Sequence, residues 1–248
     1  MSFVVAIPAR YGATRLPGKV LREIAGEPLL AHVHRRALES GADEVWVATD
    51  DDRIEAAAVG FGARTARTSA ACASGSDRIA ELAAREAWPD DLAIVNLQGD
   101  EPLMPGALIR QVAEALIARP GADIATACTP IEELADYRDP NVVKVVRDDA
   151  GDALYFSRAP IPHQRGGGNG LPAGGAWRHL GIYAYRAAAL KRFAAAPPAA
   201  LERCESLEQL RALALGMRIH VVEAAALPGP GVDTEEDLAA VAALLRRG

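Results

Sequence analysis

Short apolar runs alternate with helical patterns through the first half of this chain. Residues 3–7, 44–49, 92–97 and 124–128 are apolar runs of strand length. Buried strands that alternate with helices favour a mainly parallel sheet with helices on both faces. The pattern therefore predicts an α/β fold. The expected helices span residues 28–40, 52–59, 74–87, 105–118, 201–215 and 234–247.

The alternation of strands and helices changes after Thr129. Residues 142–147 and 153–156 flank an Asp-Asp-Ala-Gly turn and predict a pair of strands. A strand over 179–185 and another over 219–222 follow. We divide the chain into a main α/β domain and a smaller subdomain that together form one continuous structural unit. The main domain comprises residues 1–129 and 218–248, and the subdomain comprises residues 130–217.

Composition excludes several classes of protein. The chain has 248 residues, 50% of them apolar, and a net charge of −6, so nothing in its overall charge favours nucleic acid or an anionic membrane surface. Its apolar stretches fall short of the roughly 20 residues that span a membrane. No signal peptide is apparent, and three scattered cysteines fit a reducing compartment. We expect a cytoplasmic protein with no nucleic-acid or membrane partner.

A cation-rich loop follows the first apolar run. It carries Arg10, Arg15 and Lys19 together with Gly12 and Gly18. Glycines allow a backbone to approach a ligand closely, and cationic side chains complement phosphate. The loop is therefore suited to a polyphosphate, although a solvated basic loop would have the same composition.

Two common phosphate-binding patterns are absent from this loop. A P-loop requires Ser or Thr after its Gly-Lys pair, and here Val20 follows Gly18 and Lys19. The GxGxxG pattern of dinucleotide-binding folds does not follow the first strand. What remains is a triphosphate site in which side-chain cations and backbone amides share the charge.

Two acidic residues occur where a sheet would present them to a ligand. Asp100 comes three residues after the apolar run 92–97, which ends in Asn96 and Leu97, and is separated from it by Gln98 and Gly99. It therefore lies at the carboxyl end of an expected strand. Asp233 lies between a Pro/Gly turn and the final expected helix. Two carboxylates of this kind suit Mg²⁺ that bridges phosphate oxygens. The alternatives are a turn residue for Asp100 and a helix N-cap for Asp233.

A third group of residues could hold an acidic, polyhydroxylated acceptor. Arginine binds carboxylates through two parallel hydrogen bonds. Two members have plain structural alternatives, since His179 on a strand could be a core histidine and Glu208 on a helix could be solvated. The group consists of Arg158, Arg165, His179, Tyr183, Glu208 and Gln209.

Taken in order, the motifs are similar to those of a known enzyme family. They are IPARYGATRLPGK, VATDD, ASGSDRIAE, VNLQGDEP, NVVKVV, LYFSRAPIP, RHLGIYAY, SLEQLR and PGPGVDTEEDL. The chain resembles the 3-deoxy-manno-octulosonate (Kdo) cytidylyltransferases over nearly its whole length. This resemblance implies a nucleotide-diphospho-sugar transferase (GT-A-like) fold whose subdomain serves acceptor binding and dimerisation. It also implies a cytoplasmic homodimer that supplies activated Kdo for lipopolysaccharide.

The resemblance also assigns roles to residues. Arg10 and Lys19 would contact the CTP phosphates with Arg15 nearby, and Asp100 and Asp233 would ligate Mg²⁺. Arg10, Lys19 and Asp100 would carry the catalysis. The residues expected around cytosine and ribose are Ser74, Arg78 and Gln98, and those expected to receive Kdo are Arg158, Arg165, His179, Tyr183, Glu208 and Gln209. His163-Gln164 and the Gly-rich stretch after them depart from the family pattern and leave the placement of Arg165 open.

The reaction implied is attack of the anomeric C2 hydroxyl of Kdo on the α-phosphorus of CTP, which gives CMP-Kdo and pyrophosphate. Three alternatives stay open. One is a cytidylyltransferase for another acidic sugar, such as sialic acid or 8-amino-Kdo. A second is a GT-A glycosyltransferase whose metal motif is Asp50-Asp51-Asp52, although a helix start explains these acids equally well. The third is a non-catalytic nucleotide sensor.

Overall fold

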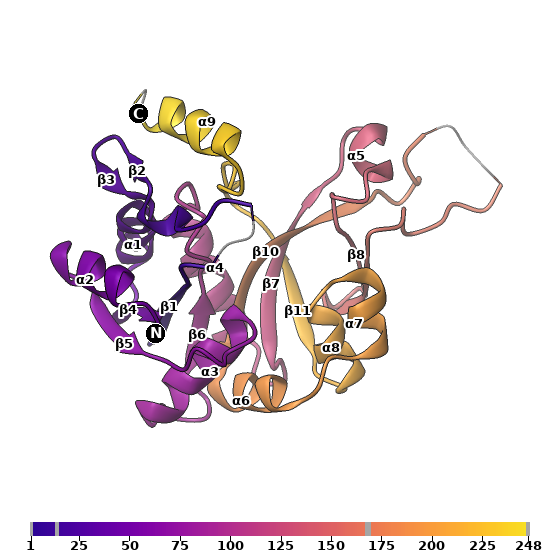
Figure 1. Cartoon of the computed structure of the whole chain (residues 1–248). Helices are drawn as coiled ribbons and strands as arrows, with labels where there is room; N and C mark the ends of the chain where they lie inside the picture. The colour runs from indigo at the N-terminus through magenta and orange to yellow at the C-terminus, as the bar shows by residue number, and fades with distance from the viewer. Residues whose placement is uncertain (1, 13–14, 167–169, 247–248) are drawn as a thin grey trace.

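A mixed β-sheet with helices on both faces forms the centre of the computed structural model (Figure 1). The model describes residues 2–12, 15–166 and 170–246. Within them the strands run in the order β11-β7-β10-β6-β1-β4-β5, with β8 paired to β10 and β9 paired to β8. The strands are β1 (Phe3–Ala9), β4 (Glu44–Thr49), β5 (Arg64–Arg67), β6 (Ala93–Asn96), β7 (Ile124–Pro130), β8 (Lys144–Arg147), β9 (Ala153–Ser157), β10 (Trp177–Arg186) and β11 (Ile219–Glu223).

The predicted α/β class is confirmed, and antiparallel pairings of β10 and β9 make the sheet mixed. β1 pairs in parallel with β4 and β6, and β4 pairs in parallel with β5. β10 lies between β6 and β7 and is antiparallel to both. The predicted strand pair of the second half is also confirmed, because β8 and β9 form an antiparallel ladder. The segment 130–217 thus supplies a strand to the middle of the main sheet.

The helices cover both faces of this sheet and follow the predicted ranges closely, with one exception described below. Short helices α5 and α6 and a small antiparallel pair, β2 (Glu23–Ile24) and β3 (Glu27–Pro28), were not predicted. The helices are η1 (Lys19–Leu21), α1 (Leu29–Glu39), α2 (Asp52–Gly60), α3 (Gly75–Arg85), α4 (Gly106–Ile117), α5 (Leu134–Arg138), α6 (Ala187–Ala195), α7 (Ala200–Glu205), α8 (Gln209–Ala214) and α9 (Glu235–Leu245). None of them is long and apolar enough to cross a membrane.

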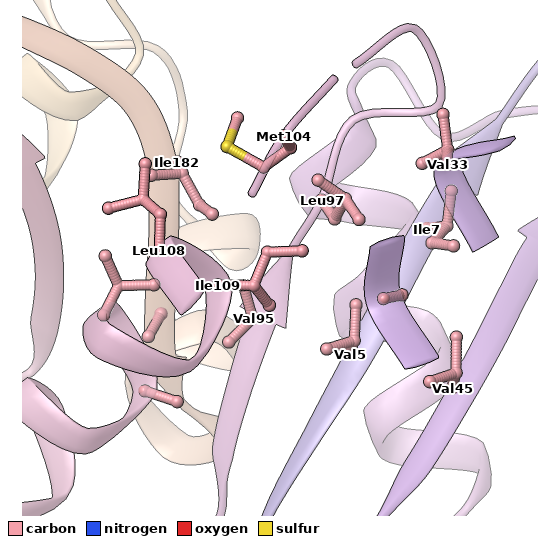
Figure 2. Packing of buried hydrophobic residues seen from close by; sticks show 14 of the residues in the cluster. Val5, Ile7, Val33, Val45, Val95, Leu97, Met104, Leu108, Ile109 and Ile182 are labelled. Atoms are coloured by element: carbon pink, nitrogen blue, oxygen red, sulfur yellow. The ribbon is translucent and has the colours of Figure 1, made fainter. Parts of the chain in front are cut away.

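Alternate residues of the central strands pack against helices on opposite faces. Figure 2 shows one face, where Val5 of β1 and Val95 of β6 lie beside Leu108 and Ile109 of α4. All four side chains are fully buried. Burial of aliphatic side chains of this size contributes about 1.5–3 kcal/mol each. The rigid sheet that results fixes the loops at the carboxyl ends of β1 and β6.

A separate hydrophobic cluster ties the C-terminal helix to the first loop. Leu16 follows β1, Ile24 lies in β2, and both pack against Val232, Leu238 and Val241. These side chains are all at least nine-tenths buried. The cluster therefore holds the segment before α9 against the cation-rich loop, although the two are more than two hundred residues apart in the sequence.

The expected helix over 201–215 is wrong, because α7 and α8 are separate. Ser206 adopts a left-handed conformation, with φ of 52°, and interrupts the helix. The interruption turns Leu207 into the buried cluster under α6 and α8. It also directs the Glu205 carboxylate to Ser157 Oγ at 2.6 Å and to the Arg158 amide at 2.9 Å. Tertiary contacts therefore outweigh the helix propensity of this alanine- and leucine-rich stretch.

Candidate active site

A cleft of about 500 Å³ lies at the carboxyl ends of β1 and β6. Open α/β sheets bind ligands at this edge. The cleft gathers residues from the first loop, the start of α3, the loop after β6, and the segment before α9. Its walls include every residue expected at the nucleotide or the metal, namely Arg10, Arg15, Lys19, Ser74, Arg78, Gln98, Asp100 and Asp233, and also Glu208 from the expected acceptor group.

The cation-rich loop turns at Gly18 and delivers Lys19 into this cleft. Gly18 has φ of 67°, and its amide donates to the Tyr11 carbonyl at 2.9 Å. A β-carbon at Gly18 would lie 2.8 Å from Cε2 of Tyr11, so both the left-handed backbone and the aromatic ring require glycine here. Lys19 then begins the short helix η1.

Lys19 joins the two predicted metal carboxylates. Its Nζ donates to Asp100 Oδ2 at 2.5 Å and to Asp233 Oδ1 at 2.9 Å, and also to the Val232 carbonyl at 3.1 Å. Burial alone would lower the pKa of Lys19, but the attraction of Asp100 and Asp233 outweighs it and raises that pKa. Arg15 pairs with the other oxygen of Asp233 at 2.8 Å. The two distant acids thus converge on one cation.

Asp233 is not the cap of the final helix. Thr234 is the N-cap of α9, where its hydroxyl accepts from the Asp237 amide and Asp237 reciprocates. The capping alternative for Asp233 is therefore wrong. Its carboxylate is turned into the cleft toward Lys19 and Arg15 instead.

The pair of carboxylates fits a Mg²⁺ ion. Both groups direct carboxylate oxygens, which are hard ligands, toward the same point. In this structure the Nζ atom of Lys19 occupies that point. No group of three or more potential ligands among His, Cys, Asp and Glu is present within residues 2–12, 15–166 and 170–246. Mg²⁺ commonly binds through one or two carboxylates and completes its shell with substrate phosphates and water. Asp100 and Asp233 fit this mode of Mg²⁺ binding.

The N-terminus of α3 forms part of the wall of the cleft. Ser74 caps this helix through a reciprocal pair with Asp77, and both Ser74 and Gly75 line the cleft. A helix N-terminus favours anionic or polar ligand groups. Arg78, on the first turns of α3, is buried and donates to Thr68 Oγ1.

The acids proposed as an alternative metal motif are engaged elsewhere. Asp50 lies 3.0 Å from Arg78 Nη2, Asp51 caps α2, and Asp52 pairs with Arg67 at 2.7 Å. The interpretation of this run as a helix start is therefore confirmed. The three carboxylates do not gather on a shared cation as Asp100 and Asp233 do.

The arginines expected at the acceptor differ in their surroundings. The Arg158 guanidinium donates to the carbonyl oxygens of Glu205, Pro140 and Ser206 at 2.7, 2.9 and 3.5 Å. These bonds tie β9 to the turn between α7 and α8. Arg165 lies exposed in the long loop after β9. Neither side chain lines the cleft that holds Lys19.

The remaining expected acceptor residues lie beside β10 and on α8. His179 is buried and lines a second, smaller cavity of about 250 Å³. The Tyr183 ring lies 5.4 Å from the His179 ring, tilted by 45°. Gln209 is buried at the start of α8, next to Glu208 on the cleft wall. Of the acceptor group, the described structure brings only Glu208 to the nucleotide cleft.

Comparison with known proteins supports a nucleotide-binding role for this cleft. A family model described as cytidylyltransferase matches residues 4–219, which is most of the chain. The chain belongs to the cytidylyltransferase family.

Close relatives sharpen this assignment. A 3-deoxy-manno-octulosonate cytidylyltransferase of Thioalkalivibrio sulfidiphilus is 57% identical over 249 residues, covering 99% of this chain and 100% of the relative. One from Halorhodospira halophila is 55% identical over 250 residues, covering 99% of this chain and 97% of the relative.

Solved structures of similar proteins support the same family assignment. A structure of CMP:2-keto-3-deoxy-manno-octonic acid synthetase complexed with CTP has a TM-score of 0.91 at 41% identity, covering 100% of this chain and 99% of that one. A 4-diphosphocytidyl-2C-methyl-D-erythritol synthase has a TM-score of 0.64 at 16% identity, covering 98% of each chain. The second likeness shows the shared cytidylyltransferase fold alone.

A polar chain under the cleft of this cytidylyltransferase was not predicted. Gln98 donates to Asn96 Oδ1 at 3.0 Å, Asn96 donates to Ser76 Oγ at 3.5 Å, and Ser76 donates to Glu208 at 3.2 Å. Burial raises the pKa of Glu208, so this carboxylate is not the solvated helix residue of the structural alternative. The sequence contained one signal of this polar chain, because Asn96 places a polar amide at the end of an apolar strand.

Glu101 is an acid beside the cleft to which sequence reasoning assigned no role. Burial, together with the negative charges of Asp100 and Asp233, raises the pKa of its carboxyl to about 7. It lines the smaller cavity rather than the cleft. Its position directly after Asp100 was the only hint in the sequence.

Replacing Arg158 with alanine is expected to lower the melting temperature. The variant leaves three carbonyl acceptors without their cationic donor, a loss of about 1–3 kcal/mol. At this chain length, that loss corresponds to about 2–12 °C. Thermal unfolding followed by circular dichroism measures the shift.

Arg165→Ala is the matched control, since it removes the same charge from an exposed position. We expect its melting temperature to equal that of the wild type. A variant Arg158→Ala that unfolds at the wild-type temperature would contradict the structural role given to Arg158.

His179 is expected to make the fold sensitive to acid. The Thr126 hydroxyl donates to the Ile182 carbonyl at 2.7 Å, so it must accept from His179 Nε2 at 3.0 Å. Burial lowers the pKa of His179 from 6.5 to about 3. Because the unfolded chain binds the proton more readily, stability falls as the pH drops below 6.5 and stops falling near 3, and the loss is about 3 kcal/mol at pH 4.

Melting temperatures of the wild type and His179→Gln between pH 7 and pH 4 check this prediction. The glutamine amide can still donate to Thr126 but does not titrate, so the variant should lose less stability toward low pH. His163→Gln, which changes an exposed histidine, should retain the wild-type profile. Parallel profiles for the wild type and His179→Gln would disprove the prediction.

Proposed function

We propose that this protein transfers CMP from CTP to the anomeric hydroxyl of 3-deoxy-D-manno-octulosonate and releases pyrophosphate. The observation that carries the proposal is the convergence of Asp100, Asp233 and Lys19 in the large cleft. Relatives that align over almost the whole chain carry the name of this activity, and a structurally similar protein was solved as a complex with CTP.

The residues of the cleft supply positioning and charge neutralisation. Arg10, Arg15 and Lys19 face the space that a triphosphate would enter. Their charges offset the negative charge that builds up on the departing pyrophosphate as the sugar hydroxyl attacks the α-phosphorus. Phosphoryl transfer depends mainly on such positioning and electrostatic stabilisation.

Asp100 and Asp233 are the residues that would hold Mg²⁺. When bound, the ion would neutralise triphosphate charge and make the attacking hydroxyl easier to deprotonate. Lys19, which holds the two carboxylates together in this structure, would then be able to turn its charge toward the phosphates.

The proposal also covers the binding of Kdo and the assembly of the protein. We assign the Kdo carboxylate and hydroxyls to Arg158, Arg165, His179, Tyr183, Glu208 and Gln209, the set implied by the family resemblance. Arg158 donates three of its N–H groups to backbone carbonyls, and a guanidinium has five. Two N–H groups therefore remain for Kdo while the bonds to the α7–α8 turn are kept. We further propose a cytoplasmic homodimer that serves lipopolysaccharide synthesis.

Pyrophosphate release tests the proposed function. We expect rapid release with CTP, Mg²⁺ and Kdo, and far slower release when UTP replaces CTP or when EDTA removes the metal. Sialic acid and 8-amino-Kdo, offered in competition with Kdo, test the alternative acceptors, and faster use of either would reassign the substrate. CTP binding without pyrophosphate release would instead identify a nucleotide sensor.

A further inference from the structure

Tyr11 and Gly18 form the base of the cation-rich loop. The Gly18 amide donates to the Tyr11 carbonyl at 2.9 Å, and the Tyr11 ring covers the α-carbon of Gly18. Arg10 directly precedes Tyr11 and Lys19 directly follows Gly18. The relative position of these two cleft cations therefore depends on the Tyr11–Gly18 contact.

Arg53 also packs on the Tyr11 ring. Its Cζ atom is 3.4 Å from the centre of that ring, the distance of a stacked guanidinium. Asp51 fixes the plane of the guanidinium, because it accepts from Nε at 3.0 Å and from Nη2 at 2.6 Å. Asp51 is itself fixed at the start of α2, where it accepts from the Arg53 amide at 2.9 Å.

These contacts form one continuous connection from helix α2 to the cleft. Asp51 orients Arg53, Arg53 packs on Tyr11, and Tyr11 packs on the glycine that precedes Lys19. Neither Asp51 nor Arg53 lines the cleft, and their charges neutralise each other. The pair therefore has no net charge with which to attract a triphosphate directly.

We propose that Arg53 is a positioning residue for the triphosphate loop, acting through Tyr11 and Gly18 on the placement of Arg10 and Lys19. The inference rests on the proposed use of CTP as a substrate. It adds a residue outside the cleft to the determinants of nucleotide affinity.

The chain contains a matched control. Arg64 has an exposed guanidinium like that of Arg53, with side-chain exposures of 60% and 58%. It also pairs with an acid, Glu44, at 2.9 Å, and lies 5.6 Å from the Trp46 ring. Arg64 belongs to the strand at the sheet edge, β5, and does not line the cleft. Arg64→Ala therefore removes an equivalent charge, pair and aromatic contact without touching the loop.

Calorimetric titration with CTP in the presence of Mg²⁺ tests the proposal. We expect Arg53→Ala and Tyr11→Ala to weaken CTP binding by about fivefold, and the double variant to be no weaker than Tyr11→Ala. Tyr11→Phe keeps the ring and should bind as the wild type does, and Arg64→Ala should be unchanged. In steady-state assays the KM for CTP should rise while the KM for Kdo stays constant.

Asp51→Asn separates positioning from direct charge attraction. Asparagine caps helices as well as aspartate does, so α2 is retained while Arg53 loses its charged partner. Positioning predicts weaker CTP binding, whereas direct attraction by the released cation predicts tighter binding. Tighter binding, or unchanged binding in Arg53→Ala, would overturn the proposal. If the wild type binds CTP but releases no pyrophosphate with Kdo, the proposed reaction fails while these affinities still test the loop.

Discussion

Asp100→Asn is expected to lower kcat by about 100- to 1000-fold, the range found when one preorganised electrostatic contact to a transition state is removed. The carboxylate accepts from Lys19 at 2.5 Å and lies at the end of the buried strand β6, in the wall of the nucleotide cleft. An amide of the same shape keeps the packing but loses the charge that would hold Mg²⁺ and Lys19 in place. Pyrophosphate release at saturating CTP and Kdo measures the effect.

The control for this change is Asp52→Asn. It makes the same substitution at a side chain that is 90% exposed and paired with Arg67, and its turnover should match the wild type. Circular dichroism and thermal unfolding establish that Asp100→Asn is folded. Wild-type turnover in folded Asp100→Asn would remove this carboxylate from the mechanism.

Lys19→Met is expected to reduce kcat/KM for CTP by about 100-fold or more, because it removes a cation aimed at the triphosphate. It should also lower the melting temperature. Without the ammonium, Asp100 loses its cationic partner and Asp233 keeps only Arg15. Leaving a partly buried carboxylate without its donor costs about 1–3 kcal/mol, or about 2–12 °C.

Two further variants separate these contributions. Lys19→Arg retains the charge and should recover most of the stability but only part of the activity, since a guanidinium has a different shape. The double variant Lys19→Met/Asp100→Asn removes the unpaired carboxylate and should melt at a higher temperature than Lys19→Met alone. A single variant that is as stable as the wild type would show that Lys19 does not hold the two acids together.

Local signals in the sequence were sufficient for most of the elements. Periodic apolar residues predicted α3, and the cation-rich loop and Asp100 were found from their place after apolar strands. These features depend on neighbours in the sequence. The same reasoning left Asp233 ambiguous, because Asp233 and Thr234 are both good caps and only the fold shows that Thr234 takes this role.

Features set by distant contacts could not be predicted. The break at Ser206 exists because Leu207 fills the core and Glu205 meets β9. The position of β10 between β6 and β7 depends on pairing across the whole sheet. The surroundings of Arg158 likewise depend on carbonyl oxygens from two remote turns, which no spacing rule reveals.

The docking of α9 has a consequence for the order in which the enzyme is made. Asp233 comes after the last strand, β11, and is held in place because Val232, Leu238 and Val241 pack on Leu16 and Ile24. A nascent chain that has emerged only through β11 can pair every strand and still lack one of the two acids at the cleft. The meeting of Asp233 with Asp100 therefore depends on the docking of α9 on Leu16 and Ile24, and the pairing of the strands alone does not bring the two acids together.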